Sequence, residues 1–362
     1  MQPSIHGTEA IFRIAEPRAG LVAFIVIDST RLGPAFARVR IRPFDLERDA
    51  LIEAIDTAAA ATVEAAMAGL PCGGGAIVAV PRPRLRREAA QSVLREVIDG
   101  LRGRVVAWHD PLTGGPISAA SGRYGRSGAR RAHARAGGQP PEPDNAAVRG
   151  ALAAIRAAVG HTGLSSLPAP HDRLDGMRVC VQGLGPFGLA LVRSALAAGA
   201  EVVASDADPV ASRRGARLGA RIVPPGRIVR LRADVLLPAS DSTCLDEEFA
   251  ARCGARIVCS PLALLSMQPE AEAELRRRGI AYVPGTLAGA GALIEVVRLV
   301  MKRARGGKIA WDAAGSDAIG AVEAIGPRVR RFLRDVDRTG LLPSELVRRA
   351  VLRRLSRFHG GA

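Results

Sequence analysis

The sequence predicts an α/β protein with two α/β domains, the second of them a Rossmann dinucleotide-binding domain. At 362 residues, 48% of them hydrophobic, the chain is long enough to bury the cores of two domains. From Met177 onward, short apolar runs alternate with alanine-rich or amphipathic stretches, as strands and helices do in a doubly wound parallel sheet. A glycine-rich turn follows the first of these runs.

That turn lies in Arg178–Val203, where the sequence GLGPFG stands between an apolar run and an alanine-rich helix. The first glycine of such a G-x-G-x-x-G motif permits a tight turn, the second admits a pyrophosphate, and the third lets the helix pack on the sheet. An acid about twenty residues on accepts hydrogen bonds from a ribose and disfavours a 2′-phosphate, which predicts NAD over NADP. The candidate cofactor-binding residues are Gly183, Gly185, Pro186, Phe187, Gly188 and Asp206.

Residues 1–145 are predicted to form the N-terminal α/β domain, and its segment 121–144 a basic flexible loop. Its expected strands and helices are Leu21–Asp28, Ala37–Ile41, Asp45–Met67 (a helix with Asp45 as N-cap), Ala76–Val80, Arg84–Leu101 (a helix) and Val105–Trp108. Residues 146–330 are predicted to form the Rossmann domain, and residues 331–362 a basic helical segment. The expected elements of the Rossmann domain are a helix over Ala146–Val159, strands at Glu201–Ser205, Asp234–Pro238, Arg256–Cys259 and Ala281–Pro284, and a helix over Ala292–Arg303.

The net charge is +16, and Lys302 and Lys308 are the only lysines among the 51 basic residues. Arginines concentrate in Ser121–Gly138 and in the C-terminal third, which suits attraction to polyanions. With Tyr124 as the only aromatic residue of the first cluster, we expect a solvated face rather than a nucleic-acid site. No run is apolar enough for a membrane span, no signal peptide is expected, and five cysteines without C-x-x-C spacing predict a reduced, cytoplasmic protein.

Several short motifs, in order, resemble the glutamate/leucine/phenylalanine/valine dehydrogenase family, most closely its leucine and phenylalanine branch. They are Leu32-Gly33-Pro34-Ala35, Ala68-Gly69-Leu70 with Gly73-Gly74-Gly75, Asp110, Arg149-Gly150, the GLGPFG turn, Asp206, Pro238, Tyr282-Val283-Pro284 and Ala290-Gly291. The resemblance implies an N-terminal substrate and oligomerisation domain, a C-terminal NAD domain with an active cleft between the two, and a homo-oligomer. It also implies oxidative deamination of an L-amino acid with NAD as the cofactor.

The same resemblance implies two lysines that this chain lacks. The lysine that binds the substrate carboxylate falls on Glu64, and the lysine that activates water falls on Ala76. An acid at the first position repels a carboxylate, and alanine moves no proton. The family's asparagine-rich nicotinamide turn falls on Ser260–Leu265, and its pocket asparagine falls on Gly289. We therefore expect the family's deamination to be absent or weak.

Two interpretations stay open. In the first, the protein has changed its reaction: His109 and Asp110 handle protons, Arg38 binds an anionic group and Glu64 a cationic one, and the substrate is a small amino, imino or oxo acid. In the second, it is an inactive paralogue that acts as a regulatory or structural subunit. Plainer readings make Glu64 a solvated helix residue and Arg38 incidental. A third interpretation, from another class, is polyanion binding through the arginine-rich segments.

Overall fold

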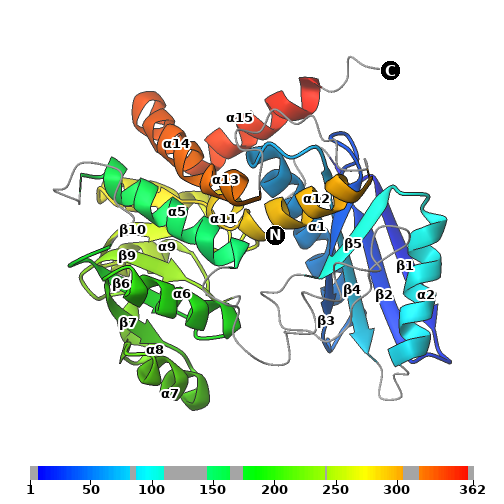
Figure 1. Ribbon diagram of the computed structural model, residues 1–362, viewed down its shortest axis with the longest axis horizontal. Coiled ribbons are helices and arrows are strands. Elements are labelled where there is room, and N and C mark those ends of the chain that lie inside the picture. Colours follow the sequence, from blue (N-terminus) through cyan, green and yellow to red (C-terminus); the bar gives the residue numbers. More distant parts are fainter. Residues whose placement is uncertain are drawn as a thin grey trace. The chain divides into compact units, whose positions relative to one another are not determined.

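The chain divides into two compact units, which are described separately (Figure 1). The computed structural model describes residues 7–81, 87–109, 145–163, 174–240, 243–304 and 318–357. Unit 1 takes in Met1–Gly138, Leu293–Asp312 and Arg348–Ala362, and unit 2 takes in Gln139–Ala292 and Ala313–Val347. Both contain parallel strands and helices, so the predicted α/β class is confirmed.

Unit 1 is built on a five-stranded mixed sheet with the strand order β1-β2-β4-β3-β5. Its strands are β1 (Ala10–Glu16), β2 (Leu21–Ile27), β3 (Ala35–Ile41), β4 (Gly73–Pro81) and β5 (Val105–His109). β2 pairs antiparallel with β1 and β4, whereas β3 pairs parallel with β4 and β5. The strand β1 was not predicted. It is an edge strand whose residues alternate between half-buried and exposed, so it lacks the continuous apolar run of β2.

The two faces of this sheet are covered by different helices. Alternate residues such as Ile25, Ile27 and Ile77 pack on α2 (Arg87–Gly100). The intervening residues, such as Val26 and Ala76, pack on α1 (Glu47–Met67). This alternation follows from the two-residue period of a strand.

The start of α1 differs from the prediction. Asp45 is not its N-cap: the cap position is Leu46, which has no side-chain hydrogen bond. Glu47 and Asp49 instead place acidic groups in the first turn, where the helix dipole favours them. Every residue of α1 from Thr57 to Ala66 is buried, and nearly all of them are small.

Unit 2 is an all-parallel sheet of six strands in the order β11-β10-β9-β6-β7-β8. The strands are β6 (Arg178–Gln182), β7 (Glu201–Ser205), β8 (Arg221–Ile222), β9 (Ala233–Pro238), β10 (Ala255–Cys259) and β11 (Ala281–Val283). The order reverses between β6 and β9, which is the Rossmann arrangement with a topological switch point at the end of the first strand.

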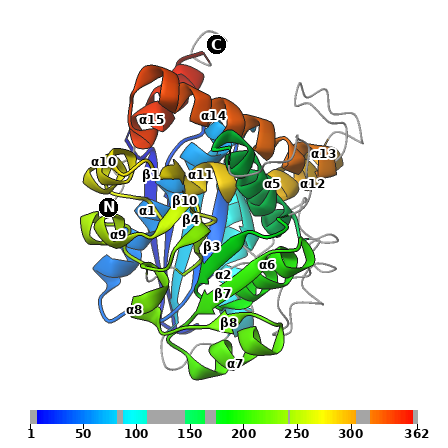
Figure 2. The same cartoon turned by 90° about the vertical axis from the view of Figure 1, so that its left-hand side faces the viewer.

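Helices cover both faces of this sheet, and Figure 2 shows them around it. They are α5 (Ala146–His161), α6 (Pro186–Ala197), α7 (Pro209–Arg217), α8 (Pro225–Ile228), α9 (Glu247–Arg252), α10 (Pro269–Arg277) and α11 (Gly285–Ala288). α9 and α10 pack on the face that carries Cys180 and Leu236. The glycine-rich segment 285–291 is partly helical, since it contains α11.

The C-terminal part of the chain is helical, as predicted, in α12 (Gly291–Ala304), α13 (Ala318–Glu323), α14 (Ile325–Thr339) and α15 (Pro343–Ser356). α14 packs along α5. The motif glycines Gly150 and Gly291 allow the starts of α5 and α12 to touch: a Cβ on Gly291 would lie 2.0 Å from the Ala146 carbonyl oxygen. Within the described ranges, no helix is long and apolar enough to cross a membrane. The predicted loop at 121–144 lies outside the described residues.

Candidate functional site

The glycine turn of unit 2 joins β6 to α6, as predicted. Gly183 has φ +101°, a conformation that L side chains rarely adopt. A Cβ on Gly183 would lie 2.9 Å from the Ala239 carbonyl oxygen. A Cβ on Gly188 would lie 1.9 Å from the carbonyl oxygen of Gly183. The first and third glycines are therefore required by the packing of the turn, the helix and the end of β9.

The second glycine has a different role. Gly185 is exposed, it is the N-cap of α6, and a Cβ there would meet no atom within 4 Å. Packing therefore does not require glycine at this position. The first-turn N–H groups of a helix have no partner within the helix, which makes a helix N-terminus a favourable place for an anion. An open approach to a helix N-terminus fits a pyrophosphate.

Two of the predicted cofactor residues, Pro186 and Phe187, have no polar side chain. Pro186 occupies the first helical position, where it costs no hydrogen bond. The Phe187 side chain is 3% exposed and belongs to the core.

Asp206 follows the end of β7 and is fixed beside the turn. One carboxylate oxygen accepts a hydrogen bond from the Leu184 N–H at 2.5 Å, and the other accepts from the Asp208 N–H at 2.8 Å. These contacts hold the acid in the position where a Rossmann fold presents one to a ribose. Asp208 itself caps α7 by accepting from the Val210 N–H.

The turn after β10 is closed by its own hydrogen bonds. Ser260 is fully buried, and its hydroxyl donates to the carbonyl oxygens of Leu262 and Leu265. A Cβ on Gly289 would lie 2.8 Å from the Pro261 carbonyl oxygen. The space that an asparagine at position 289 would need is therefore filled by backbone.

In unit 1, Arg38 and Glu64 form an ion pair. Arg38 Nη2 donates to Glu64 Oε2 at 3.0 Å, and the two side chains are 6% and 0% exposed. The register explains how they meet. Arg38 of β3 lies beside Ala76 of β4 and beside Trp108 of β5, and Ala76 packs on α1, the helix that carries Glu64. Paired residues of neighbouring strands project from the same face of a sheet, so Arg38 projects towards α1.

The pair has further support from neighbouring groups. The Arg38 guanidinium lies 5.1 Å from the centre of the Trp108 ring, a cation–π distance. Two residues along β3, Arg40 makes a second ion pair with Glu53 of α1, at 3.3 Å. Guanidinium groups of β3 therefore meet carboxylates of α1 at two levels.

The positions predicted for substrate binding thus bind each other. Glu64 is not a solvated helix residue and Arg38 is not an incidental surface residue, because both are buried. Arginine stays protonated at all ordinary pH values, so Arg38 cannot act as a general base.

The glycines at the start of β4 are packed against this region. A Cβ on Gly74 would lie 2.1 Å from the Thr62 N, and a Cβ on Gly73 would lie 1.7 Å from the Ser29 carbonyl oxygen. The Thr62 hydroxyl donates to the buried Asp28 carboxylate at 2.5 Å. These glycines therefore serve close packing of β4 on α1 and on the end of β2.

Cys72 directly precedes β4 and is buried. Burial raises the pKa of its thiol, Glu64 raises it further, and Arg354 of α15 lowers it. Arg354 also donates to the Leu70 carbonyl oxygen at 3.3 Å. A thiol with a raised pKa is a poor nucleophile at neutral pH, so Cys72 is a packing residue.

The remaining predicted catalytic residues are only partly described. His109 is the last residue of β5 and pairs in register with Val39. Asp110 lies outside the described residues, as does the arginine-rich stretch 121–138. No group of three or more potential metal-ligating side chains occurs among the residues that were described.

The relatives of this chain are amino-acid dehydrogenases. An L-tryptophan dehydrogenase of Nostoc punctiforme is 29% identical over 297 residues, which cover 80% of each chain. A leucine dehydrogenase of Thermoactinomyces intermedius is 28% identical over 293 residues, covering 80% of this chain and 77% of the relative. The protein is related to the glutamate/leucine/phenylalanine/valine dehydrogenase family. The resemblance expected from the motifs is confirmed. No family model matches the chain.

Solved structures show the same fold. The L-tryptophan dehydrogenase of Nostoc punctiforme superposes with a TM-score of 0.70 at 24% identity, covering 97% of both chains. The hetero-hexameric glutamate dehydrogenase of Thermus thermophilus, in its Leu-bound form, has a TM-score of 0.70 at 22% identity, covering 98% of this chain and 90% of that one. This amino-acid-dehydrogenase-like chain therefore carries the fold of its relatives.

Sequence reasoning missed several residues of the site. Four residues of this region were not singled out. Trp108 lies beside Arg38, and Arg354 donates to the Leu70 carbonyl oxygen. The Thr62 hydroxyl donates to the Asp28 carboxylate, and the Asp28 N–H donates to the Gly74 carbonyl oxygen. The stretch AAAATVEAA around Glu64 contained a usable signal. A helix without a polar face is buried, so the one acid in it requires a partner.

Proposed function

We propose that this amino-acid-dehydrogenase-like protein binds NAD through Gly183–Gly188 and Asp206 but does not perform the oxidative deamination of its relatives. The observation that carries the second half is the buried pair of Arg38 and Glu64. Where the family resemblance places a substrate-binding lysine, this chain has a carboxylate that is already bound by its own guanidinium. The residues around the turn fit NAD, which supplies a hydride acceptor when bound.

The energetics of the pair oppose substrate binding at this point. A substrate carboxylate would have to displace Glu64 from Arg38, and separating a buried pair by removing one partner typically costs about 3–5 kcal/mol. An amino group would have to displace Arg38 from Glu64 at a similar cost. Ala76, beside Arg38, offers no group that exchanges a proton. Any reaction that persists has to draw on other residues, for which His109 and Asp110 are the candidates.

Cofactor binding is tested by calorimetric titration of the chain with NAD and with NADH. We expect binding by the wild-type protein and at least about tenfold weaker binding by Asp206→Ala, since loss of hydrogen bonds to an ionised group costs about 1.5–3 kcal/mol. Circular dichroism of Asp206→Ala checks that the turn, which Asp206 also holds, remains folded. Absence of NAD binding by the wild-type chain would refute the cofactor half of the proposal.

Loss of deamination is tested spectrophotometrically with leucine, valine, phenylalanine and tryptophan in the presence of NAD. We expect no turnover above background. Ordinary turnover with any of the four would contradict the proposal. A wider screen of amino, imino and hydroxy acids then separates an altered oxidoreductase from an inactive chain.

Restoring the family's lysines asks whether the ion pair is what blocks the site. The double variant Glu64→Lys/Ala76→Lys places two ammonium groups beside the Arg38 guanidinium, so we expect it to be inactive and less stable. The triple variant that adds Arg38→Gly removes this repulsion. Measurable deamination by the triple variant but not by the double variant is the expected result. Equal activity of both would show that Arg38 is not an obstacle.

A second candidate function is that of a non-catalytic subunit. The buried ion pair between Arg38 and Glu64 favours a non-catalytic role. The solved glutamate dehydrogenase of Thermus thermophilus is hetero-hexameric. In this reading the chain assembles with a catalytic relative and regulates or supports it. Copurification of a catalytic dehydrogenase with the tagged chain, and a change in its rate on mixing, are the expected results. A homo-oligomer that leaves a catalytic relative's rate unchanged would argue against it.

A further inference from the structure

Two side chains of α10 hold the turn between α14 and α15. α14 ends at Thr339, Gly340 follows with φ +70°, and α15 starts at Pro343. The Arg276 guanidinium donates to the Gly340 carbonyl oxygen. One helical turn earlier on α10, Glu272 Oε2 accepts from the Ser344 N–H at 2.9 Å and from the Ser344 hydroxyl at 2.7 Å.

Glu272 is a buried acid, since it is 3% exposed. The Ser344 N–H lies in the first turn of α15, where backbone donors have no partner within the helix. Glu272 therefore caps α15 from another element. The cap is reinforced by Glu345, which accepts from the Leu342 N–H at 3.0 Å. All of these contacts lie within unit 2.

The groups around Glu272 do not neutralise its charge. On β11, burial raises the pKa of the Tyr282 phenol, and the charge of the nearby Glu272 carboxylate raises it further. On α15, the Glu345 carboxylate repels Glu272. On α10, the Arg276 guanidinium is engaged by the Gly340 carbonyl oxygen. Within the described part of the chain, Glu272 forms no ion pair with a basic group.

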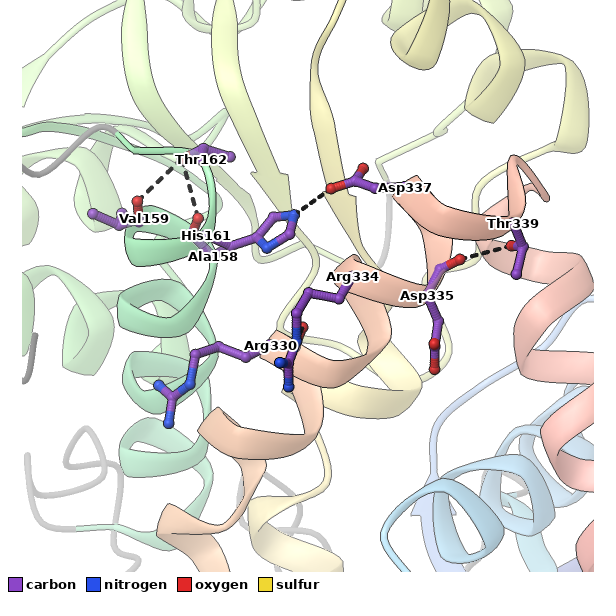
Figure 3. Close-up of polar contacts among 9 residues, drawn as sticks. All are labelled: Ala158, Val159, His161, Thr162, Arg330, Arg334, Asp335, Asp337 and Thr339. Carbon is purple, nitrogen blue, oxygen red and sulfur yellow. Dashed lines mark hydrogen bonds and ion pairs between the residues drawn. The ribbon is translucent and has the colours of Figure 1, made fainter.

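α14 is fastened independently of this contact. It packs along α5, and the His161 ring nitrogen Nε2 lies 2.8 Å from an oxygen of Asp337. Figure 3 shows this pair between the end of α5 and the last turn of α14. Loosening the Glu272 contact would therefore act on the start of α15 and leave α14 in place.

We propose that Glu272 is a proton-controlled latch on the C-terminal helix α15, which holds the first turn of the helix when neutral and loosens it when ionised. Both Ser344 contacts fall on Oε2, so a neutral carboxyl carries its proton on Oε1 and keeps Oε2 as the carbonyl oxygen that accepts from the Ser344 N–H and hydroxyl. An ionised carboxyl in the same place is a buried charge without a cation, next to Glu345. The proposal does not depend on whether the chain binds NAD.

The direction of the pH effect follows from the shift. Burial raises the pKa of Glu272 from 4.5 to about 7; the Ser344 hydrogen bonds oppose the shift, and Glu345 adds to it. A detached, solvated Glu272 returns to its ordinary pKa. Attachment therefore binds a proton: it is strongest below about pH 4.5 and weakens as pH rises to about 7. At alkaline pH the full cost of the buried charge is present.

The test is amide hydrogen exchange of the full chain, read at Ser344–Val347 and corrected for the intrinsic pH dependence of exchange. We expect the protection of these amides to fall about tenfold between about pH 6 and about pH 8. This is the change in the attachment equilibrium of α15 that follows when Glu272 has a pKa of about 7 in the attached state and its ordinary pKa in the detached state. Glu272→Gln keeps an uncharged acceptor, so protection should be high and independent of pH.

Three control variants separate the latch from other effects. Glu270→Gln changes an exposed acid on the same helix and should keep the wild-type pH dependence. His161→Gln should keep it as well, which excludes the histidine, a side chain that in general titrates in this range. Ser344→Ala removes the hydroxyl contact and should lower protection at both pH values. Equal corrected protection of wild-type α15 at both pH values would overturn the proposal, and so would a pH dependence that survives Glu272→Gln.

Discussion

Replacing Arg38 with methionine is expected to lower the free energy of unfolding by about 3–5 kcal/mol, because the buried Glu64 carboxylate loses its guanidinium. The two side chains are 6% and 0% exposed, so water cannot take the place of the missing partner. The Trp108 ring also loses the cation that lies over it. Urea denaturation followed by circular dichroism measures the change.

Replacing both members of the ion pair tests whether the loss of stability comes from the unpaired Glu64 carboxylate. Arg38→Met/Glu64→Leu removes both charges and retains apolar volume, so its stability should return to within about 1–2 kcal/mol of the wild-type chain. The matched control is Arg178→Met, which breaks an ion pair with Glu201 that is 42% and 51% exposed and should change stability far less. If the double variant were no more stable than Arg38→Met, the two residues would not be acting as a pair.

The paired variant also bears on function. An ion pair that only stabilised the fold would be replaceable by apolar residues without further consequence. If Arg38 or Glu64 handled a ligand, as the altered-reaction interpretation holds, the double variant would lose binding or turnover while keeping its stability. Comparing stability and ligand response in one variant therefore separates the two interpretations of unit 1.

The strands of unit 2 could be predicted because a parallel sheet covered on both faces needs continuous apolar strands. Val202–Ala204 and Val235–Leu237 are such runs, and the glycine turn marks where the first strand ends. The positions of Gly183 and Gly188 follow from the same motif, and the structure supplies the steric reason for each. The exposed strand β1 lacked a comparable run and was missed.

The ion pair of unit 1 could not be predicted from sequence, although each partner was singled out. Arg38 and Glu64 are 26 residues apart and lie on a strand and a helix. Their contact depends on the parallel register that sets Arg38 beside Ala76 and on the helix that covers this face. Register is a property of the assembled sheet, so residue spacing along the chain carries no direct record of it.

Gly185→Val is expected to abolish measurable NAD binding, a loss of about 100-fold or more, while leaving the fold intact. Its φ of −59° suits any L residue, and a Cβ there meets no atom within 4 Å, so the protein itself does not resist the change. A branched side chain would instead fill the approach to the α6 N-terminus that a pyrophosphate needs, and a 100-fold loss corresponds to about 2.7 kcal/mol.

Gly188→Val should lose stability as well as NAD binding. Its Cβ would fall 1.9 Å from the Gly183 carbonyl oxygen, so the turn and α6 must separate, and we expect a loss of stability of at least about 1–3 kcal/mol together with the loss of NAD binding. Gly226→Val, at an exposed position of α8 with no atom within 4 Å, is the control for adding the same side chain elsewhere. Calorimetry with NAD and thermal denaturation of the three variants measure both properties. A Cβ at position 185 meets no atom of the described residues within 4 Å. NAD binding that survives Gly185→Val would therefore mean that the cofactor does not approach α6 at this turn.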